Sequence, residues 1–238
     1  MSRKLHAQPN TIRFVLQFYK CLAKPEELAL LKPAEAKLAG TNTLRRSVRE
    51  LPAGMAALVT EAQRRFAAKE FDKAEELYVQ VLREDEKNFG ALANLALIQI
   101  RLRHFDAADQ HLKQALALAP DDPYCLQVLG RLRWLQKKPD EALDALSRAA
   151  QLDSQNPELQ DLLGVVLSEK GQRAAAEAAF RKALILAPNF ADAHQNLAYH
   201  YLLQDPPLTE LGRYHYQRAL AAGLPHSLDI EKLLDKKP

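Results

Sequence analysis

The sequence predicts an all-α protein built from stacked antiparallel helix pairs. Three observations support this prediction: the composition, a column of small residues that recurs every 34 positions, and a helical spacing of the apolar residues in between. The chain has 238 residues, of which 38 are Ala and 42 are Leu, whereas only 8 are Gly. Hydrophobic residues make up 47% and charged residues 26%, which argues against disordered, collagen-like and disulfide-scaffold classes.

The small residues show an internal repeat. One column consists of Ala62, Ala96, Gly130, Gly164 and Ala198. Two further columns run in phase with it, namely Ala74, Ala108, Ala142 and Ala176, and Val81, Ala115, Ala149 and Ala183. Small residues allow helix axes to approach closely, so these columns predict the lines along which helices pack together.

Each repeat is expected to hold two helices. Breaks fall within the units at 103–104, 137–139 and 171–172, and between units at Pro120, Pro157 and Pro188. One helix pair cannot bury its own apolar faces. Stacked pairs can, because each pair contacts its neighbours and the apolar faces join into one core.

These features resemble the tetratricopeptide repeat. The fourth unit is the best match to the family pattern, with Leu163-Gly164, Ala176, Phe180, Ala183 and Pro188 in frame. The resemblance implies a right-handed α-solenoid of about five repeats, which we place at 55–88, 89–122, 123–156, 157–190 and 191–226. In the first repeat Glu61, Arg65 and Glu86 depart from the pattern, as expected of an end unit with a polar outer face.

Two further segments flank the repeats. Residues 1–54 are expected to form a basic, partly helical N-terminal extension, with 10 Lys/Arg against 4 Asp/Glu. Residues 227–238 are predicted to form a C-terminal capping helix and tail, in which Ser227 caps a helix that ends at Leu234.

The residues argue against catalysis, a metal site and a bound cofactor. His194 and His200 are six positions apart and fall on different faces of a helix. The sequence has no Gly-rich phosphate loop and no Gly-x-Ser-x-Gly turn. Cys21 and Cys125 lie far apart, so we expect neither a zinc site nor a disulfide framework, and a reducing, cytoplasmic location fits best.

The candidate binding site follows from the resemblance. In this family the first helix of each repeat lines a concave groove. Carried onto this sequence, the candidate groove residues are Gln63, Asn94, Leu97, Arg101, Gln127, Arg131, Trp134, Asp161, Val165, Glu169, Gln195 and Tyr199. The N-terminal half of this set holds Arg101 and Arg131, whereas the C-terminal half holds acidic residues, so we expect Leu97, Trp134, Val165 and Tyr199 to act as apolar anchors between charged contacts.

The leading hypothesis is a non-catalytic scaffold or adaptor that binds a peptide or helix of a partner protein in this groove. One alternative is an accessory or regulatory module of an enzyme complex. Another is an RNA- or membrane-surface adaptor acting through the basic segment around Lys20, Arg45, Arg46 and Arg49. The net charge of +3 is too small to favour nucleic acid as the main partner, and no stretch predicts a transmembrane segment. The sequence leaves the oligomeric state open.

Overall fold

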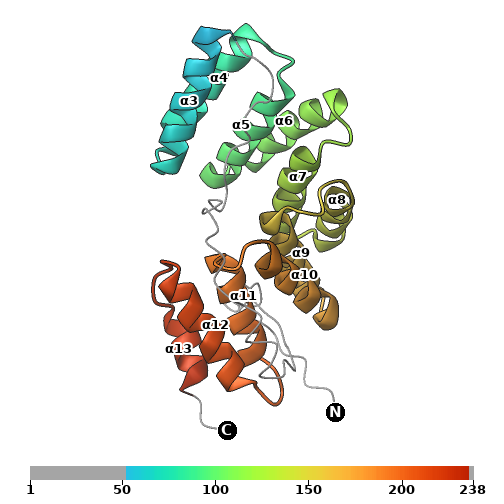
Figure 1. Cartoon of the computed structure of the whole chain (residues 1–238). Helices are drawn as coiled ribbons and strands as arrows, with labels where there is room; N and C mark the ends of the chain where they lie inside the picture. Colours follow the sequence, from blue (N-terminus) through green and yellow to red (C-terminus); the bar gives the residue numbers. More distant parts are fainter. Residues whose placement is uncertain (1–51, 236–238) are drawn as a thin grey trace. The chain divides into compact units, whose positions relative to one another are not determined.

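The computed structural model describes residues 52–235. Within this range it contains α-helices and no strands, as the sequence predicts (Figure 1). The basic residues Lys20, Arg45, Arg46 and Arg49 lie outside the described residues. The helices are α3 (Ala53–Ala67), α4 (Phe71–Glu84), α5 (Phe89–Leu102), α6 (Phe105–Leu118), α7 (Pro123–Leu135), α8 (Pro139–Leu152), α9 (Pro157–Glu169), α10 (Arg173–Leu186), α11 (Ala191–Leu202), α12 (Thr209–Ala221) and α13 (Leu228–Leu234).

The described residues fall into two compact units, 52–154 and 155–235. In the first unit the helices pair as α3 with α4, α5 with α6 and α7 with α8, while α5 also packs on α7. In the second unit α9 pairs with α10 and α11 with α12, while α9 also packs on α11 and α13 packs on α11 and α12. Both units are therefore built from neighbouring helix pairs, and in each unit two first helices contact each other, α5 with α7 and α9 with α11.

The columns of small residues are buried at the predicted contact lines. Every member of the Ala74 and Val81 columns has a relative exposure of 0%. A Cβ added to Gly130 would lie 2.5 Å from Cγ of Leu146, and one added to Gly164 would lie 2.7 Å from two ring carbons of Phe180. These distances are shorter than van der Waals contact, so the two helices of a pair touch where glycine stands.

Helix starts recur with the same period. Asn88, Asp122 and Asn156 are the N-caps of α5, α7 and α9, and their side-chain oxygens accept backbone N–H groups at 3.0, 2.9 and 3.0 Å. Such caps satisfy N–H groups that have no partner within the helix. Proline follows the cap in α7 and α9, where its fixed φ suits the first helical position.

The turns within the pairs also share a geometry. Lys69, Arg103, Lys137 and Gly171 have φ values of 61°, 67°, 64° and 72° and are spaced 34 residues apart. A left-handed residue at this place ends the first helix and reverses the chain. Only one of the four is the glycine that this conformation favours.

The last helix closes the second unit. Ile230 on α13 has 0% exposure, and α13 packs on both α11 and α12. Ser227 occupies the N-cap position, but its side chain makes no capping bond. Its Oγ lies 3.1 Å from the hydroxyl of Tyr199 instead, which corrects the expected role of the serine.

Candidate functional site

All twelve candidate groove residues lie on the first helices of the pairs. Gln63 is on α3, Gln195 and Tyr199 are on α11, and the rest are on α5, α7 and α9. Seven lie in the unit 52–154 and five in the unit 155–235. Because α5 packs on α7 and α9 packs on α11, each unit brings the candidates of these helices onto adjacent helices.

Half of the candidates have buried side chains. Leu97 is 3% exposed and belongs to a core cluster that includes Val128 and Leu132. Val165 is 7% exposed and Tyr199 2%. A ligand that touches these three side chains must displace the groups that now cover them. The buried candidates are Asn94, Leu97, Gln127, Asp161, Val165 and Tyr199.

Asn94 is held between two tyrosines. Its Nδ2 donates to the hydroxyl of Tyr78 at 3.0 Å, and its Oδ1 accepts the hydroxyl of Tyr124 at 2.9 Å. Burial raises the pKa of Tyr78 well above its ordinary value, so this hydroxyl stays neutral. The amide thus connects α4, α5 and the start of α7.

A second buried amide in the other unit binds a carboxylate. Nδ2 of Asn196 donates to Oδ1 of Asp161 at 2.7 Å, which joins α9 to α11. Tyr199 lies on the same helix as Asn196, and burial raises the pKa of its hydroxyl. Asp161 and Asn196 are thus hydrogen-bonded to each other, and the hydroxyl of Tyr199 is neutral at neutral pH.

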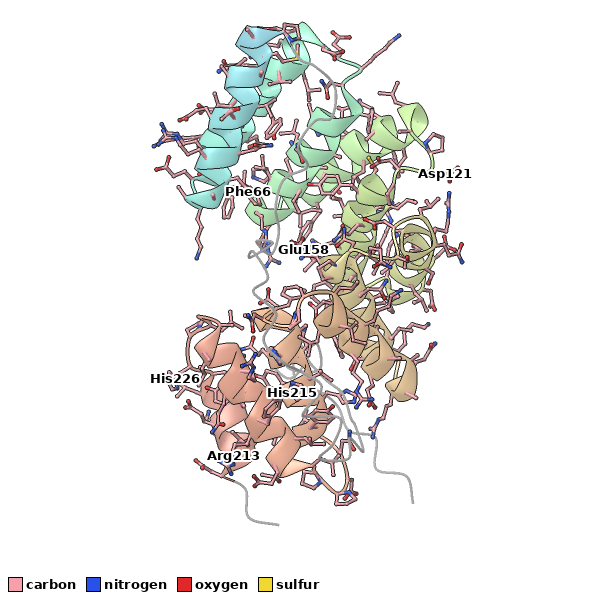
Figure 2. The ribbon with its side chains drawn as sticks, in the orientation of Figure 1. Phe66, Asp121, Glu158, Arg213, His215 and His226 are labelled. Atoms are coloured by element: carbon pink, nitrogen blue, oxygen red, sulfur yellow. The ribbon has the colours of Figure 1, made fainter. Side chains whose placement is uncertain are left out.

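The remaining candidates are accessible to a ligand. Arg101 is exposed, and Gln63, Arg131, Trp134, Glu169 and Gln195 are partly exposed. In the first unit the accessible charged candidates are both arginines. In the second unit Glu169 is accessible, and Glu158 and Asp192 on the first helices α9 and α11 are partly exposed (Glu158 is labelled in Figure 2). The two units therefore present first-helix faces of opposite charge.

A separate hollow of about 490 Å³ lies between α4, α5 and α6. It is lined by Leu82, Glu86, Lys87, Leu92, His111, Gln114, Ala117 and Leu118. None of these residues is a candidate groove residue. The hollow gives the first unit an alternative surface that a binding experiment has to distinguish from the first-helix face.

The fifth helix pair also contains two histidines in contact, which the sequence did not predict. Nδ1 of His194 lies 2.8 Å from Nδ1 of His215, on α11 and α12. His194 and His200 share helix α11, so helical spacing relates these two, whereas His215 lies on the next helix. One feature of the sequence indicates that His215 lies near the core: it immediately precedes Tyr216, the large residue of its helix that packs inward. Within residues 52–235 no group of three or more His, Cys, Asp or Glu side chains is placed to bind a metal ion.

Comparison with known proteins identifies the type of repeat. Two family models described as tetratricopeptide repeat match residues 65–132 and 157–190. The mouse (Mus musculus) interferon-induced protein with tetratricopeptide repeats 3 is 33% identical over 99 residues, which is 40% of this chain and 25% of that protein. The chain thus spans about a quarter of the length of this curated relative.

Two solved structures share the fold. TTC0263, a thermophilic tetratricopeptide repeat protein of Thermus thermophilus, aligns with a TM-score of 0.65 and 23% identity, over 75% of this chain and 95% of that one. YrrB, described as a tetratricopeptide repeat protein with an unusual peptide-binding site, aligns with a TM-score of 0.53 and 20% identity, over 74% of this chain and 89% of that one.

No helix within residues 52–235 is both long and apolar enough to cross a bilayer. The buried small-residue columns, the shared helix caps and turns, and both family models agree on the nature of the repeat. Such repeats generally form non-catalytic scaffolds for protein–protein interactions. Residues 65–132 and 157–190 of the chain are tetratricopeptide repeats.

Proposed function

We propose that this protein is a non-catalytic adaptor whose first helices bind segments of partner proteins. The observation that carries the proposal is the opposite charge of the two first-helix faces. Arg101 and Arg131 suit an acidic segment in the unit 52–154, and Glu158, Glu169 and Asp192 suit a basic segment in the unit 155–235. Opposite charges fix the register of a bound segment and speed its encounter more than they increase its affinity.

Trp134 is the proposed apolar anchor of the first unit. It is partly exposed on α7, the helix that also carries Arg131. Tryptophan and arginine are the residue types that most often dominate binding energy at protein interfaces. Leu97, by contrast, contributes only if binding uncovers it, because it is 3% exposed.

Fold similarity supports the same class of ligand. YrrB, a protein with this fold, is described as having a peptide-binding site. We extend only the class of ligand to this chain, since the likeness concerns the fold. The same proposal includes the absence of catalysis and of a cofactor and a preference for protein over nucleic acid. It also includes a reducing cytoplasmic location, in which the thiol of Cys125 stays reduced.

The test is a charge reversal with a matched control. Arg101→Glu with Arg131→Glu inverts the face of the first unit, whereas Arg83→Glu with Arg148→Glu makes the same change in charge on α4 and α8. The probes are 15-residue peptides of matched apolar content that carry either Glu or Lys, and binding is followed by the fluorescence of Trp134, the only tryptophan in the chain.

We expect wild type and control to bind the Glu peptide with an affinity that falls as salt rises. The double variant should bind it at least 10-fold more weakly at low salt and with a smaller salt dependence. If the double variant and wild type bind the Glu peptide equally, or if the control loses binding as well, the first-helix face is not the site.

A further inference from the structure

The fifth helix pair contains a buried pair of histidines. His194 is 1% exposed and His215 4%, and their Nδ1 atoms are 2.8 Å apart. The ring centroids are separated by 5.1 Å, and the ring of Tyr201 lies 5.3 Å from that of His215. Figure 2 labels His215 on α12, among the orange C-terminal helices. The contact joins the two helices on which α13 rests.

The hydrogen bonds fix the position of each proton. Nε2 of His194 lies 3.0 Å from the carbonyl oxygen of Pro188, which can only accept, so this nitrogen carries the proton. Nδ1 of neutral His194 is therefore unprotonated and accepts the Nδ1–H of His215. One proton therefore lies between the two facing Nδ1 atoms, carried by His215.

Adding a proton to either ring either breaks the hydrogen bond between the rings or creates a buried charge. On His194 it would occupy Nδ1 and face the N–H of His215, which breaks the hydrogen bond. On His215 it would occupy Nε2 and create a buried cation near Arg218 on α12 and Arg181 on α10. A buried charge without an opposite partner is strongly unfavourable.

Three acidic groups of the surrounding helices bind residues other than the two histidines. Glu177 on α10 pairs with Arg181, Asp161 on α9 accepts from Asn196, and Glu231 on α13 accepts from Tyr216 and His226. Asp192 on α11 and Glu210 on α12 lie in the first turns of their helices, where they favour the positive end of the helix dipole. The other titratable rings against the pair are those of Tyr201 and Tyr214, and the ring of His200 lies against that of Tyr201.

We infer that His194 and His215 form an acid-sensitive lock that holds α11 against α12 at neutral pH and releases this helix pair when the medium is acidified. The inference goes beyond the proposed binding function. Its consequence for that function is that acid would loosen the support of α13 and uncover Tyr199, whose hydroxyl contacts Ser227.

The direction of the pH effect follows from linkage. Burial lowers the pKa of His194 to about 4, and Arg218 acts in the same direction. Burial also lowers the pKa of His215 well below its ordinary value, aided by His194 and the two arginines. Because the open segment binds more protons than the closed one, closure is strongest above the ordinary histidine pKa of about 6.5 and weakens as the pH falls from there toward 4. At pH 5.0 each histidine should favour opening by about 30-fold relative to pH 7.5.

Hydrogen exchange of the full chain tests the lock. The readout is the opening equilibrium of α11 and α12 at pH 5.0 and 7.5, corrected for the intrinsic pH dependence of exchange. The internal reference is α7 and α8, which contain no histidine. We expect opening of α11 and α12 to rise at least 30-fold at pH 5.0 while the reference helices change by less than 3-fold. An equal change in both regions would overturn the inference.

Two further measurements assign the effect to the pair. His194→Gln with His215→Gln removes both rings of the pair while keeping amide hydrogen bonds and leaves buried His200 in place, so it should reduce the pH effect at least 30-fold. His226→Gln, at an exposed ring, should leave the pH effect intact. Because the double variant can fail to fold, exchange at the imidazole C2 position in the wild-type chain provides an independent test. Protonation of either ring at pH 6 or above would contradict the lock.

Discussion

The amide of Asn94 donates to the hydroxyl of Tyr78, and this bond joins the second helix of one pair to the first helix of the next. Tyr78 is 0% exposed and Asn94 2%. The asparagine that the family pattern places in the groove is therefore also a structural link between neighbouring repeats. Its two hydrogen bonds, to Tyr78 and Tyr124, are therefore expected to contribute to stability.

Asn94→Ala should lower the free energy of unfolding by about 2 to 3 kcal/mol, because it leaves two tyrosine hydroxyls without this partner. Tyr124→Phe removes only one of the bonds and should cost about 1 kcal/mol. Urea unfolding monitored by Trp134 fluorescence measures both. Equal and small losses in the two variants would show that the buried amide contributes little.

Gly130→Ala should destabilise the protein by about 1 to 3 kcal/mol, since the added Cβ would lie 2.5 Å from Leu146. Gly54→Ala is the matched control, because nothing lies within 4 Å of a Cβ at that helical position. The control should be stabilised by up to about 1 kcal/mol. Thermal unfolding by circular dichroism distinguishes the two, and destabilisation by Gly54→Ala of the same size would remove the packing explanation.

The larger substitutions Gly164→Leu and Ala142→Leu should cost about 1 to 3 kcal/mol or more. Gly164 lies against Phe180, and Ala142 has 0% exposure, so neither position has room for a longer side chain. Melting of either variant at the wild-type temperature would mean that the small-residue columns do not set the helix spacing.

Lys69→Gly should raise the free energy of unfolding by about 0.5 to 1 kcal/mol, because it relieves a side chain held at φ 61°. Gly171 occupies the same place three repeats later, at φ 72° with open space around it. Gly171→Ala should therefore lower stability by about 1 kcal/mol through backbone strain alone. Urea unfolding should therefore show changes in the free energy of unfolding of opposite sign for the two variants. Changes of the same sign would contradict the role of backbone strain at this turn position.

Tyr216→Phe should loosen α13 without unfolding the other helices. The Tyr216 hydroxyl accepts the backbone N–H of Ser227 at 2.7 Å and donates to Glu231 at 2.9 Å. Loss of both bonds should increase hydrogen exchange in α13 by about 10-fold, as expected for about 1.4 kcal/mol. Unchanged exchange in α13 would show that the burial of Ile230 alone holds this helix.

The helix pairs could be predicted from the sequence because Ala74, Ala108, Ala142 and Ala176 recur at one fixed spacing, and a fixed spacing implies a repeated contact. The caps at Asn88, Asp122 and Asn156 follow the same period and could have been recognised in the same way. Local rules therefore account for most of the fold.

The burial of the candidate site residues and their contacts could not be predicted from a fixed spacing. Leu97 and Tyr199 stand at positions that the family pattern places in the groove, but their burial depends on what packs over them. His194 and His215 meet across two helices at a separation of 21 residues, which no helical spacing rule links. The hydroxyl of Ser227 bonds Tyr199 rather than a backbone N–H of its own helix, and α13 packs on α11.

Crosslinking at matched glutamine positions tests the adaptor proposal most directly. A photoreactive residue at Gln63 or Gln195 samples the first-helix faces, and the same residue at exposed Gln114 or Gln217 samples the second helices of the same units. Crosslinked partner segments are then sequenced by mass spectrometry. The experiment is repeated in a protein that carries both Arg101→Glu and Arg131→Glu. We predict that Gln63 captures acidic protein segments, that Gln195 captures basic ones, and that capture at Gln63 is lost in the charge-reversed background. Equal capture at Gln114 and Gln217, or capture at Gln63 that survives the charge reversal, would contradict the proposed function.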